Sequence, residues 1–208
     1  MTTPRTVLVP AARVQRWFDN FSARHGPPSY DVRGGALHAV APDGAVAEAR
    51  LPFARGYAGP ADPAALAAAV VAPARWGVLL VRKGGFAVAV VARQEVVGSK
   101  VGQRHVQGRT KAGGQSQQRF ARRRDNQARL AYEAAADHAA RVLAGRLDAL
   151  VCGGDRPAVE AVLSDARLAH LAAVRVAPWL DVPDPRRAVL ERAVADGSSA
   201  TVTVTDPS

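Results

Sequence analysis

Residues 76–92 read WGVLLVRKGGFAVAVVA and carry the strongest strand signal in the chain. The glycine-bearing turn KGG separates two apolar runs, 76–82 and 86–92, as in a β-hairpin. A third strand is expected directly afterwards, over 94–106. These segments predict the first strands of a β-sheet, and the rest of the fold is read outward from them.

A polar loop and a long helix are expected next. Residues 107–118 read QGRTKAGGQSQQ and predict the loop, and residues 119–144 predict the helix. Beyond them we expect a buried strand at 147–152, helices at 155–164 and 185–196, a strand near 173–177 and an edge strand at 200–205. Strands and helices in this order are typical of an α/β fold with a mixed β-sheet flanked by helices.

The first 73 residues predict a smaller extension. Residues 10–24 have the pattern of an amphipathic helix, two short strands are expected at about 30–40 and 45–53, and an alanine-rich helix at 62–72 begins at the capping residue Asp62. Three aromatic residues, Trp17, Phe18 and Phe21, are expected to fix the first helix to its neighbours. We therefore predict an N-terminal helix-plus-hairpin extension, 1–73, packed on a core domain, 74–208.

Positive charge is concentrated in one part of the chain. The formal net charge is +10, and the stretch from Lys100 to Arg129 holds nine Lys or Arg residues against one acid, Asp125. Such a stretch indicates a polyanionic partner, most often nucleic acid. The alternative is a solvated helix face with no partner.

Several classes of protein are disfavoured by composition. The sequence has no apolar run long enough for a transmembrane helix and no signal-peptide pattern, so we expect a cytoplasmic protein without membrane contact. Cys152 is the single cysteine, and the five histidines lack the spacing of metal ligands. We expect no metal site and no cofactor, and we expect a monomer.

Gly113-Gly114-Gln115 forms the candidate catalytic tip within the predicted loop. Paired glycines give the backbone unusual freedom, and a glutamine amide both donates and accepts hydrogen bonds. The triplet alone is weak support, because it is expected by chance in roughly one chain in twenty or thirty of this length. Its flanking residues make it specific.

Those flanking residues predict a two-faced helix after the tip. At 100° per residue, one face holds apolar residues and His138, namely Phe120, Ala128, Ala131, Ala135, His138 and Val142. The opposite side is basic or polar: Arg119, Arg122, Arg123, Asn126 and Arg129. The apolar face would anchor the helix on the sheet, and the basic side would face a phosphate backbone beside the tip.

The sequence around the tip resembles a known family. The run GGQS at 113–116, followed by RFAR at 119–122 and by Arg124, is similar to the central domain of the eukaryotic and archaeal class-one peptide release factors. The resemblance covers roughly 75–180 and implies their RNase H-like fold. The chain is too short to hold a stop-codon-reading domain as well. Its basic segment before the tip looks more like the Vms-like release factors, which have actinobacterial members.

This resemblance implies a function and a set of site residues. It implies codon-independent hydrolysis of peptidyl-tRNA on stalled ribosomes or large subunits, with ribosomal RNA and peptidyl-tRNA as partners. Gln115 would act in catalysis, and Gly113 and Gly114 would permit its geometry. The RNA-binding residues implied are Arg109, Lys111, Arg119, Arg122, Arg123, Arg124 and Arg129.

Two other functions remain open from the residues alone. A nuclease acting on the tRNA 3′ end would also use a basic loop, but Glu95 is the only acid from Trp76 to Arg124, and metal-dependent nucleases usually need clustered carboxylates. A non-catalytic RNA-binding module would explain the charge and leave the tip unexplained.

Other polar or reactive residues are interpreted as structural. His138, Trp76 and Trp179 are expected in or near the core, and Cys152 is expected to be a buried small residue. His105, in the basic region, is expected to be structural, with RNA contact as the alternative. Gly153-Gly154-Asp155 predicts a tight strand-to-helix turn rather than an anion site.

Overall fold

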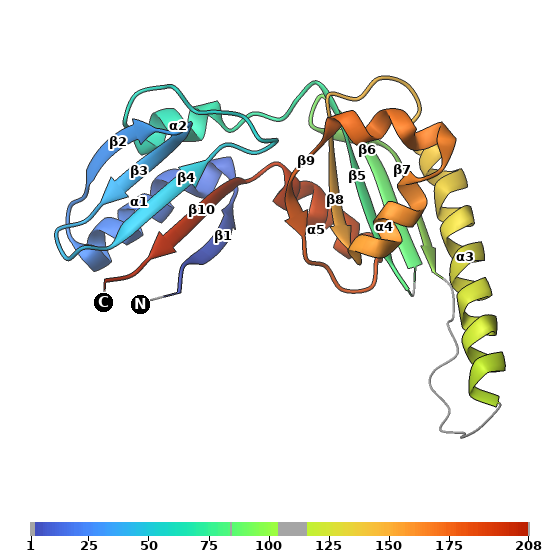
Figure 1. The fold of residues 1–208 in the computed structure, drawn as a ribbon. Coiled ribbons are helices and arrows are strands. Elements are labelled where there is room, and N and C mark those ends of the chain that lie inside the picture. Colours follow the sequence, from blue (N-terminus) through green and yellow to red (C-terminus); the bar gives the residue numbers. More distant parts are fainter. Residues whose placement is uncertain (1–2, 84, 104–115, 208) are drawn as a thin grey trace. The chain divides into compact units, whose positions relative to one another are not determined.

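The computed structural model describes residues 3–83, 85–103 and 116–207, with side chains described from residue 129 onward in the last range. The chain divides into two compact units, which we call unit 1 and unit 2 (Figure 1). Unit 1 comprises Met1–Ala72 and Val194–Ser208, and unit 2 comprises Pro73–Ala193. Each unit has its own sheet and its own hydrophobic core.

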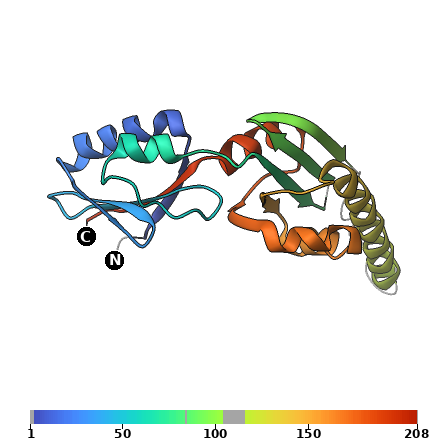
Figure 2. The ribbon, with the colours of Figure 1, turned by 90° about the horizontal axis from the view of Figure 1, so that it is seen from above.

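Unit 1 contains a five-stranded antiparallel sheet with two helices on one face (Figure 2). The strand order is β1-β10-β4-β3-β2. The strands are β1 (Arg5–Val9), β2 (Ser29–Arg33), β3 (Ala36–Val40), β4 (Val46–Arg50) and β10 (Ala200–Thr205), and the helices are α1 (Ala11–His25) and α2 (Pro63–Ala69).

The core of unit 1 lies between that sheet and α1. Val14, Phe18 and Phe21 of α1 are buried against apolar strand residues, and Trp17 packs beside them. The predicted aromatic anchor of the first helix is therefore confirmed. Helix α2 begins where predicted, because the Asp62 side chain accepts a hydrogen bond from the Ala65 backbone N–H at 2.7 Å.

The N-terminal extension is more than the predicted helix plus hairpin. The single strand expected at about 30–40 is instead the hairpin β2–β3, because Gly34 and Gly35 adopt φ values of 56° and 71° and turn the chain. Strand β1 was not predicted, although its residues 6–9 (TVLV) are of the types enriched in strands. The expected edge strand at 200–205 forms as β10, but it lies between β1 and β4 and belongs to unit 1.

Unit 2 is built on a mixed five-stranded sheet of order β7-β6-β5-β8-β9. Strands β5 (Arg75–Arg82), β6 (Gly85–Ala92) and β7 (Glu95–Gln103) are antiparallel neighbours, as the opening hairpin predicted. Strands β8 (Ala149–Gly154) and β9 (Arg175–Leu180) continue the sheet in parallel with β5. The predicted α/β class with a mixed sheet is confirmed for this unit.

Helices cover both faces of the unit 2 sheet. Helices α3 (Ser116–Val142) and α4 (Arg156–Leu163) and the 3-10 segment η1 (Ala166–Val174) pack on one face, and α5 (Arg187–Gly197) lies on the other (Figure 2). The Arg187 guanidinium donates a hydrogen bond to the Ser99 hydroxyl at 2.9 Å, which ties the start of α5 to β7. Segment η1 was not predicted.

Candidate functional site

The segment that holds the predicted tip leaves unit 2 from one edge of its sheet. Gln103, the last residue of β7, pairs with Gly85, which in turn pairs with Arg82 at the end of β5. Gly154, at the end of β8, pairs with Val81. We call this row the carboxyl edge, because the parallel strands β5 and β8 end there. Open α/β sheets commonly bind ligands at this edge.

Helix α3 starts directly after the tip. Ser116 is its first residue and follows Gln115 in the chain. The 27-residue helix is about 40 Å long at about 1.5 Å per residue, and it runs past the carboxyl edge of the sheet (Figure 1). Its C-terminal half is anchored by the buried side chains Ala135, Ala136 and Ala139, and Leu143, the residue directly after the helix, is buried with them.

The buried face of α3 is rotated from the predicted one. Ala135 is buried as expected, whereas Ala131 and Val142 are only partly buried and Leu143 is fully enclosed. A Cβ atom built on Gly77 would lie 2.9 Å from a Leu143 methyl carbon, so Leu143 fills the space above that glycine. Helix α3 contacts β6, β7, α4 and η1, and this packing favours the face with the small residues Ala135, Ala136 and Ala139.

His138 lies at the margin of the core rather than within it. Its ring stacks on Phe86 with 5.4 Å between ring centroids, and its Nδ1 atom is 2.9 Å from the Arg141 guanidinium. Partial burial, and secondarily the Arg141 charge, lower the pKa of His138. The predicted core histidine is therefore a half-buried residue at the edge of the core, where its ring packs on Phe86.

The predicted tip residues and many of the predicted RNA-binding residues lie outside the described part of the chain. Arg109, Lys111, Gly113, Gly114, Gln115 and also His105 belong to residues 104–115. Arg119, Arg122, Arg123 and Arg124 belong to α3, but their side chains are outside the described part. Arg129 is described: it is exposed, and it donates to the Glu133 carboxylate at 2.7 Å.

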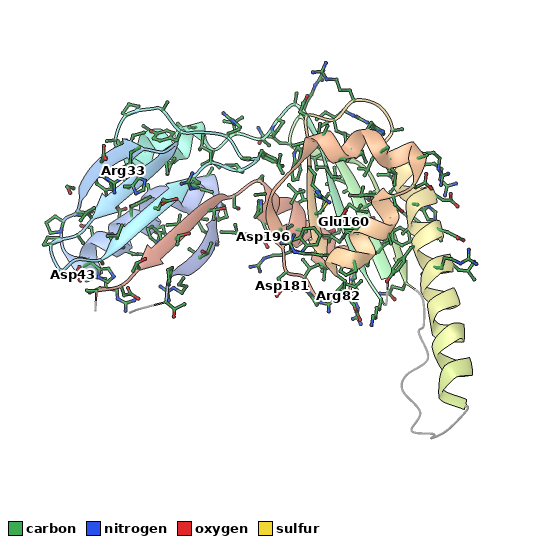
Figure 3. The ribbon with its side chains drawn as sticks, in the orientation of Figure 1. Arg33, Asp43, Arg82, Glu160, Asp181 and Asp196 are labelled. Atoms are coloured by element: carbon green, nitrogen blue, oxygen red, sulfur yellow. The ribbon has the colours of Figure 1, made fainter. Side chains whose placement is uncertain are left out.

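The carboxyl edge carries a charged cluster that sequence reasoning missed. Arg82 (labelled in Figure 3) donates to the Val182 carbonyl at 2.7 Å. Its Nη2 atom lies 3.6 Å from an Asp155 carboxylate oxygen. Asp155 also accepts from the Lys83 backbone N–H at 3.3 Å. The cluster joins the ends of β5 and β8 to the chain after β9. No residue spacing in the sequence signals these contacts.

Trp179 supports a second cation at the same edge. Its indole N–H donates to the Gly154 carbonyl at 3.1 Å, and the Arg156 guanidinium carbon lies 4.3 Å from the ring centroid. A cation over an aromatic face is held by the ring quadrupole. Arg156 is exposed, and Trp179 is partly buried, as its near-core prediction required.

A cavity of about 250 Å³ lies between the carboxyl edge and α3. Its lining is mostly apolar and includes Phe86, Gly102, Gln103, Ala131 and Tyr132. Burial, and secondarily the Asp155 charge, raise the pKa of Tyr132, so this phenol is neutral at ordinary pH. The cavity offers an apolar space beside the start of the tip-bearing segment.

The turn after β8 is a tight structural turn, as predicted. Gly154 has φ of 90°, and a Cβ atom there would lie 2.3 Å from the Val81 carbonyl oxygen, so glycine is required. Asp155 precedes α4 but makes no side-chain capping bond there.

Cys152 lies in β8, two residues before Gly154. It is 1% exposed, and burial raises the pKa of its thiol to about 12. Its predicted role as a buried small residue is confirmed.

Two kinds of feature are absent from the described residues. There, no three His, Cys, Asp or Glu side chains are grouped closely enough to hold a metal ion. Across the same ranges, no helix combines the length and apolar character needed to cross a membrane.

Comparison with known families identifies a family for this chain. Residues 74–203 match a family model described as the actinobacteria/chloroflexi VLRF1 release factor. The matched range covers most of unit 2, both strands that meet at the carboxyl edge and the whole segment between β7 and α3. Comparison with curated proteins gave no match.

Proposed function

Because this chain belongs to the VLRF1 release factor family of actinobacteria and chloroflexi, we propose that it is a codon-independent peptidyl-tRNA hydrolase. Its substrate would be the ester between a nascent chain and tRNA on stalled ribosomes or large subunits. Membership of this family supports a ribosome-related release function. We propose in addition the reaction and the residues that perform it.

The sequence of the connecting segment is the observation that supports this chemistry most directly. Residues 113–115 read GGQ, and they fall between the end of β7 at the carboxyl edge and the first residue of α3. Nine Lys or Arg residues between Lys100 and Arg129 surround that triplet in the sequence. A neutral amide among phosphate-binding cations suits an RNA-linked ester.

The proposed reaction is attack of water on the ester carbonyl. Both the carbonyl oxygen and the leaving ribose oxygen gain negative charge, so hydrogen-bond donors directed at them lower the barrier. A glutamine side chain is too weak a base to remove the proton from water. We assign to Gln115 the positioning of water and, through its backbone N–H, stabilisation of the developing charge. Gly113 and Gly114 would provide the required backbone conformations.

The described part of unit 2 would act as a support for the tip. The Arg82–Asp155 contact and the Trp179–Gly154 hydrogen bond fix the carboxyl edge. Lys83 and Arg156 are exposed at that edge and add positive charge beside the tip-bearing segment. The strand order β7-β6-β5-β8-β9, antiparallel and then parallel, is consistent with an RNase H-like fold of release-factor type.

Cleavage of the tRNA itself is the competing function. A metal-dependent nuclease usually requires clustered carboxylates near the scissile phosphate. The tip-bearing segment lacks acids, and Asp155 at the carboxyl edge is engaged by Arg82 and the Lys83 N–H. This distribution of charge favours ester hydrolysis over phosphate cleavage.

One assay separates the candidate functions. The protein is incubated with large subunits carrying peptidyl-tRNA, and peptide and tRNA are analysed separately. Free peptide with full-length tRNA supports hydrolysis, and shortened tRNA indicates a nuclease. Bound protein with neither product indicates a passive RNA-binding module and rejects the proposal.

A further inference from the structure

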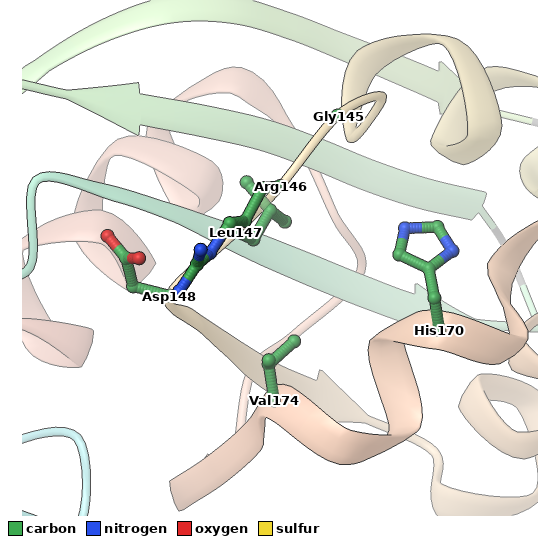
Figure 4. A pocket seen from close by; sticks show the side chains of 6 residues that line it. All are labelled: Gly145, Arg146, Leu147, Asp148, His170 and Val174. Carbon is green, nitrogen blue, oxygen red and sulfur yellow. The ribbon is translucent and has the colours of Figure 1, made fainter.

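A second cavity opens at the opposite edge of the unit 2 sheet, where β5 and β8 begin. It has a volume of about 590 Å³ and is lined by Gly145, Arg146, Leu147, Asp148, His170 and Val174 (Figure 4). The segment 145–148 connects α3 to β8, and the other two residues belong to η1. Asp148 donates its backbone N–H to the Arg75 carbonyl at 2.8 Å, which fixes this segment beside the start of β5. We call this the amino edge.

The cavity is suited to an anion. Arg146 and His170 are its two side chains able to carry positive charge, both are exposed, and neither makes an ion pair among the described residues. The acid in the lining, Asp148, is directed away from His170 (Figure 4), and its carboxylate accepts the Arg75 backbone N–H at 3.1 Å. Arg146 thus offers a fixed positive charge to a ligand, and His170 offers an exposed imidazole beside it.

Two further arginines lie along the same edge. Arg75 begins β5, and its guanidinium donates to the Ala144 carbonyl at 3.1 Å; it forms no ion pair with a carboxylate of the described residues. Arg93 is exposed in the turn between β6 and β7, and its backbone N–H donates to the Ala74 carbonyl at 3.2 Å. A row of arginines at the ends of neighbouring strands matches an extended chain of negative charges better than a single small ion.

We propose that the amino edge of unit 2 binds the phosphate backbone of large-subunit ribosomal RNA, with Arg146 and His170 at the centre of the contact. The cavity has the volume of a small-ligand site, enough for one nucleotide. Only the choice of ribosomal RNA as the ligand rests on the proposed function. The cavity and its unpaired cations do not depend on hydrolysis at the tip.

The distance between the two edges means that a contact at the amino edge could help to orient the protein on RNA. Strand β5 has eight residues and therefore spans about 25 Å at about 3.3 Å per residue. A phosphate contact at the amino edge would act together with the basic segment at the other end of the sheet. Two separated contacts fix an orientation, which a single basic loop does not.

The test measures binding to vacant large subunits as a function of salt, so that it needs no peptidyl-tRNA. Arg146→Gln is expected to weaken binding by about 5- to 10-fold and to lower the slope of log K against log salt by about 0.7–0.9, the value for one phosphate contact. Arg146→Lys should retain most of the slope. His170→Gln, a second exposed change in the same cavity, should weaken binding by a smaller factor.

Arg167→Gln is the matched control. Arg167 lies in η1 near the cavity and loses the same charge, but it is held by Asp165 and Asp137 at 2.7 Å. The inference is overturned if Arg146→Gln and Arg167→Gln have equal effects, or if the Arg146 variant keeps the wild-type slope. A wild-type protein that binds through Arg146 but releases no peptide would reject the proposed hydrolysis and leave this site standing.

Discussion

Asp155 stands at the end of β8 with its carboxylate 3.6 Å from the Arg82 guanidinium at the end of β5. In the sequence, β6, β7, the tip-bearing segment, α3 and β8 all lie between the two residues, yet they meet at the carboxyl edge. Their contact joins the ends of β5 and β8 at the edge of the sheet where β7 ends and residues 104–115 begin. It therefore stabilises the part of the sheet next to the proposed catalytic segment.

Replacing the tip glutamine tests the proposed catalysis. Gln115→Ala keeps the backbone N–H and removes the side chain that would position water, so peptide release is expected to fall by about 100-fold, the scale for misplacement of a reacting group. Binding to large subunits should change little, because the side chain is neutral. The measurement is single-turnover release at saturating protein. Gln117→Ala, two residues further along, is the matched control, and an equal loss in both variants would contradict the role given to Gln115.

Charge reversal in α3 tests the proposed RNA contact beside the tip. Arg122→Glu with Arg123→Glu should weaken large-subunit binding by at least about 100-fold near physiological salt. The salt slope should fall by about 1.5, because two phosphate contacts are lost. Binding measured between low and high salt checks this. Unchanged affinity would mean that these arginines belong to a solvated face without a partner.

Gly154 is expected to be intolerant of substitution. Gly154→Ala combines a strained φ of 90° with a clash of 2.3 Å against the Val81 carbonyl oxygen, so the free energy of unfolding should fall by at least about 2 kcal/mol. Gly145→Ala is the control: its φ is 84°, but a Cβ atom meets nothing within 4 Å. It should cost only about 1 kcal/mol. Urea denaturation of both variants measures the difference, and equal losses would refute the steric argument.

The thiol of Cys152 should report unfolding of unit 2. It is 1% exposed, and burial raises its pKa to about 12, so almost no reactive thiolate is present in the native protein at pH 8. Iodoacetamide should leave the native chain unmodified for hours and label it readily in urea. Rapid labelling of the native protein, followed by mass spectrometry, would show that β8 is not enclosed as described.

A carboxylate in unit 1 should make stability depend on pH. The Ala45 backbone N–H, and secondarily His25 at 2.8 Å, lower the pKa of Asp43 below its ordinary value of 3.8. The ionised form therefore stabilises the fold above pH 3.8, and that contribution disappears as pH falls through the lowered value. Asp43→Asn should lower Tm at neutral pH, and the difference from wild type should shrink in strong acid. A constant difference down to pH 2 would contradict this.

Local patterns in the sequence were sufficient for many of the elements of unit 2. The strands of the hairpin β5–β6 begin and end within one residue of their predicted bounds. The reason is that the two apolar runs and the glycine turn follow one another directly in the sequence. Strand β1 and the internal position of β10 were not predicted. They depend on pairing between residues 5–9 and 200–205, which no local period can signal.

In the candidate site, too, local features could be predicted from the sequence and long-range contacts could not. The GGQ tip and its basic flanks are visible as residue types, and their role stays a prediction. The supports at the carboxyl edge were missed, because Arg82 and Asp155 or Trp179 and Gly154 meet only through parallel strand pairing. The rotation of α3 was missed for a related reason: an average helical wheel does not include the space above Gly77 that Leu143 fills.

The insertion of β10 between β1 and β4 has a consequence for how the chain matures during its own synthesis. Residues 73–193, which form unit 2, are made after β4 and before β10, so unit 2 is inserted between two strands that are neighbours in the sheet of unit 1. The N-terminal sheet cannot close until residues 200–205 have left the exit tunnel. Unit 1 is thus begun first and completed last. In a nascent chain stalled before Ala200, β1 and β4 would each have an unpaired edge where β10 belongs.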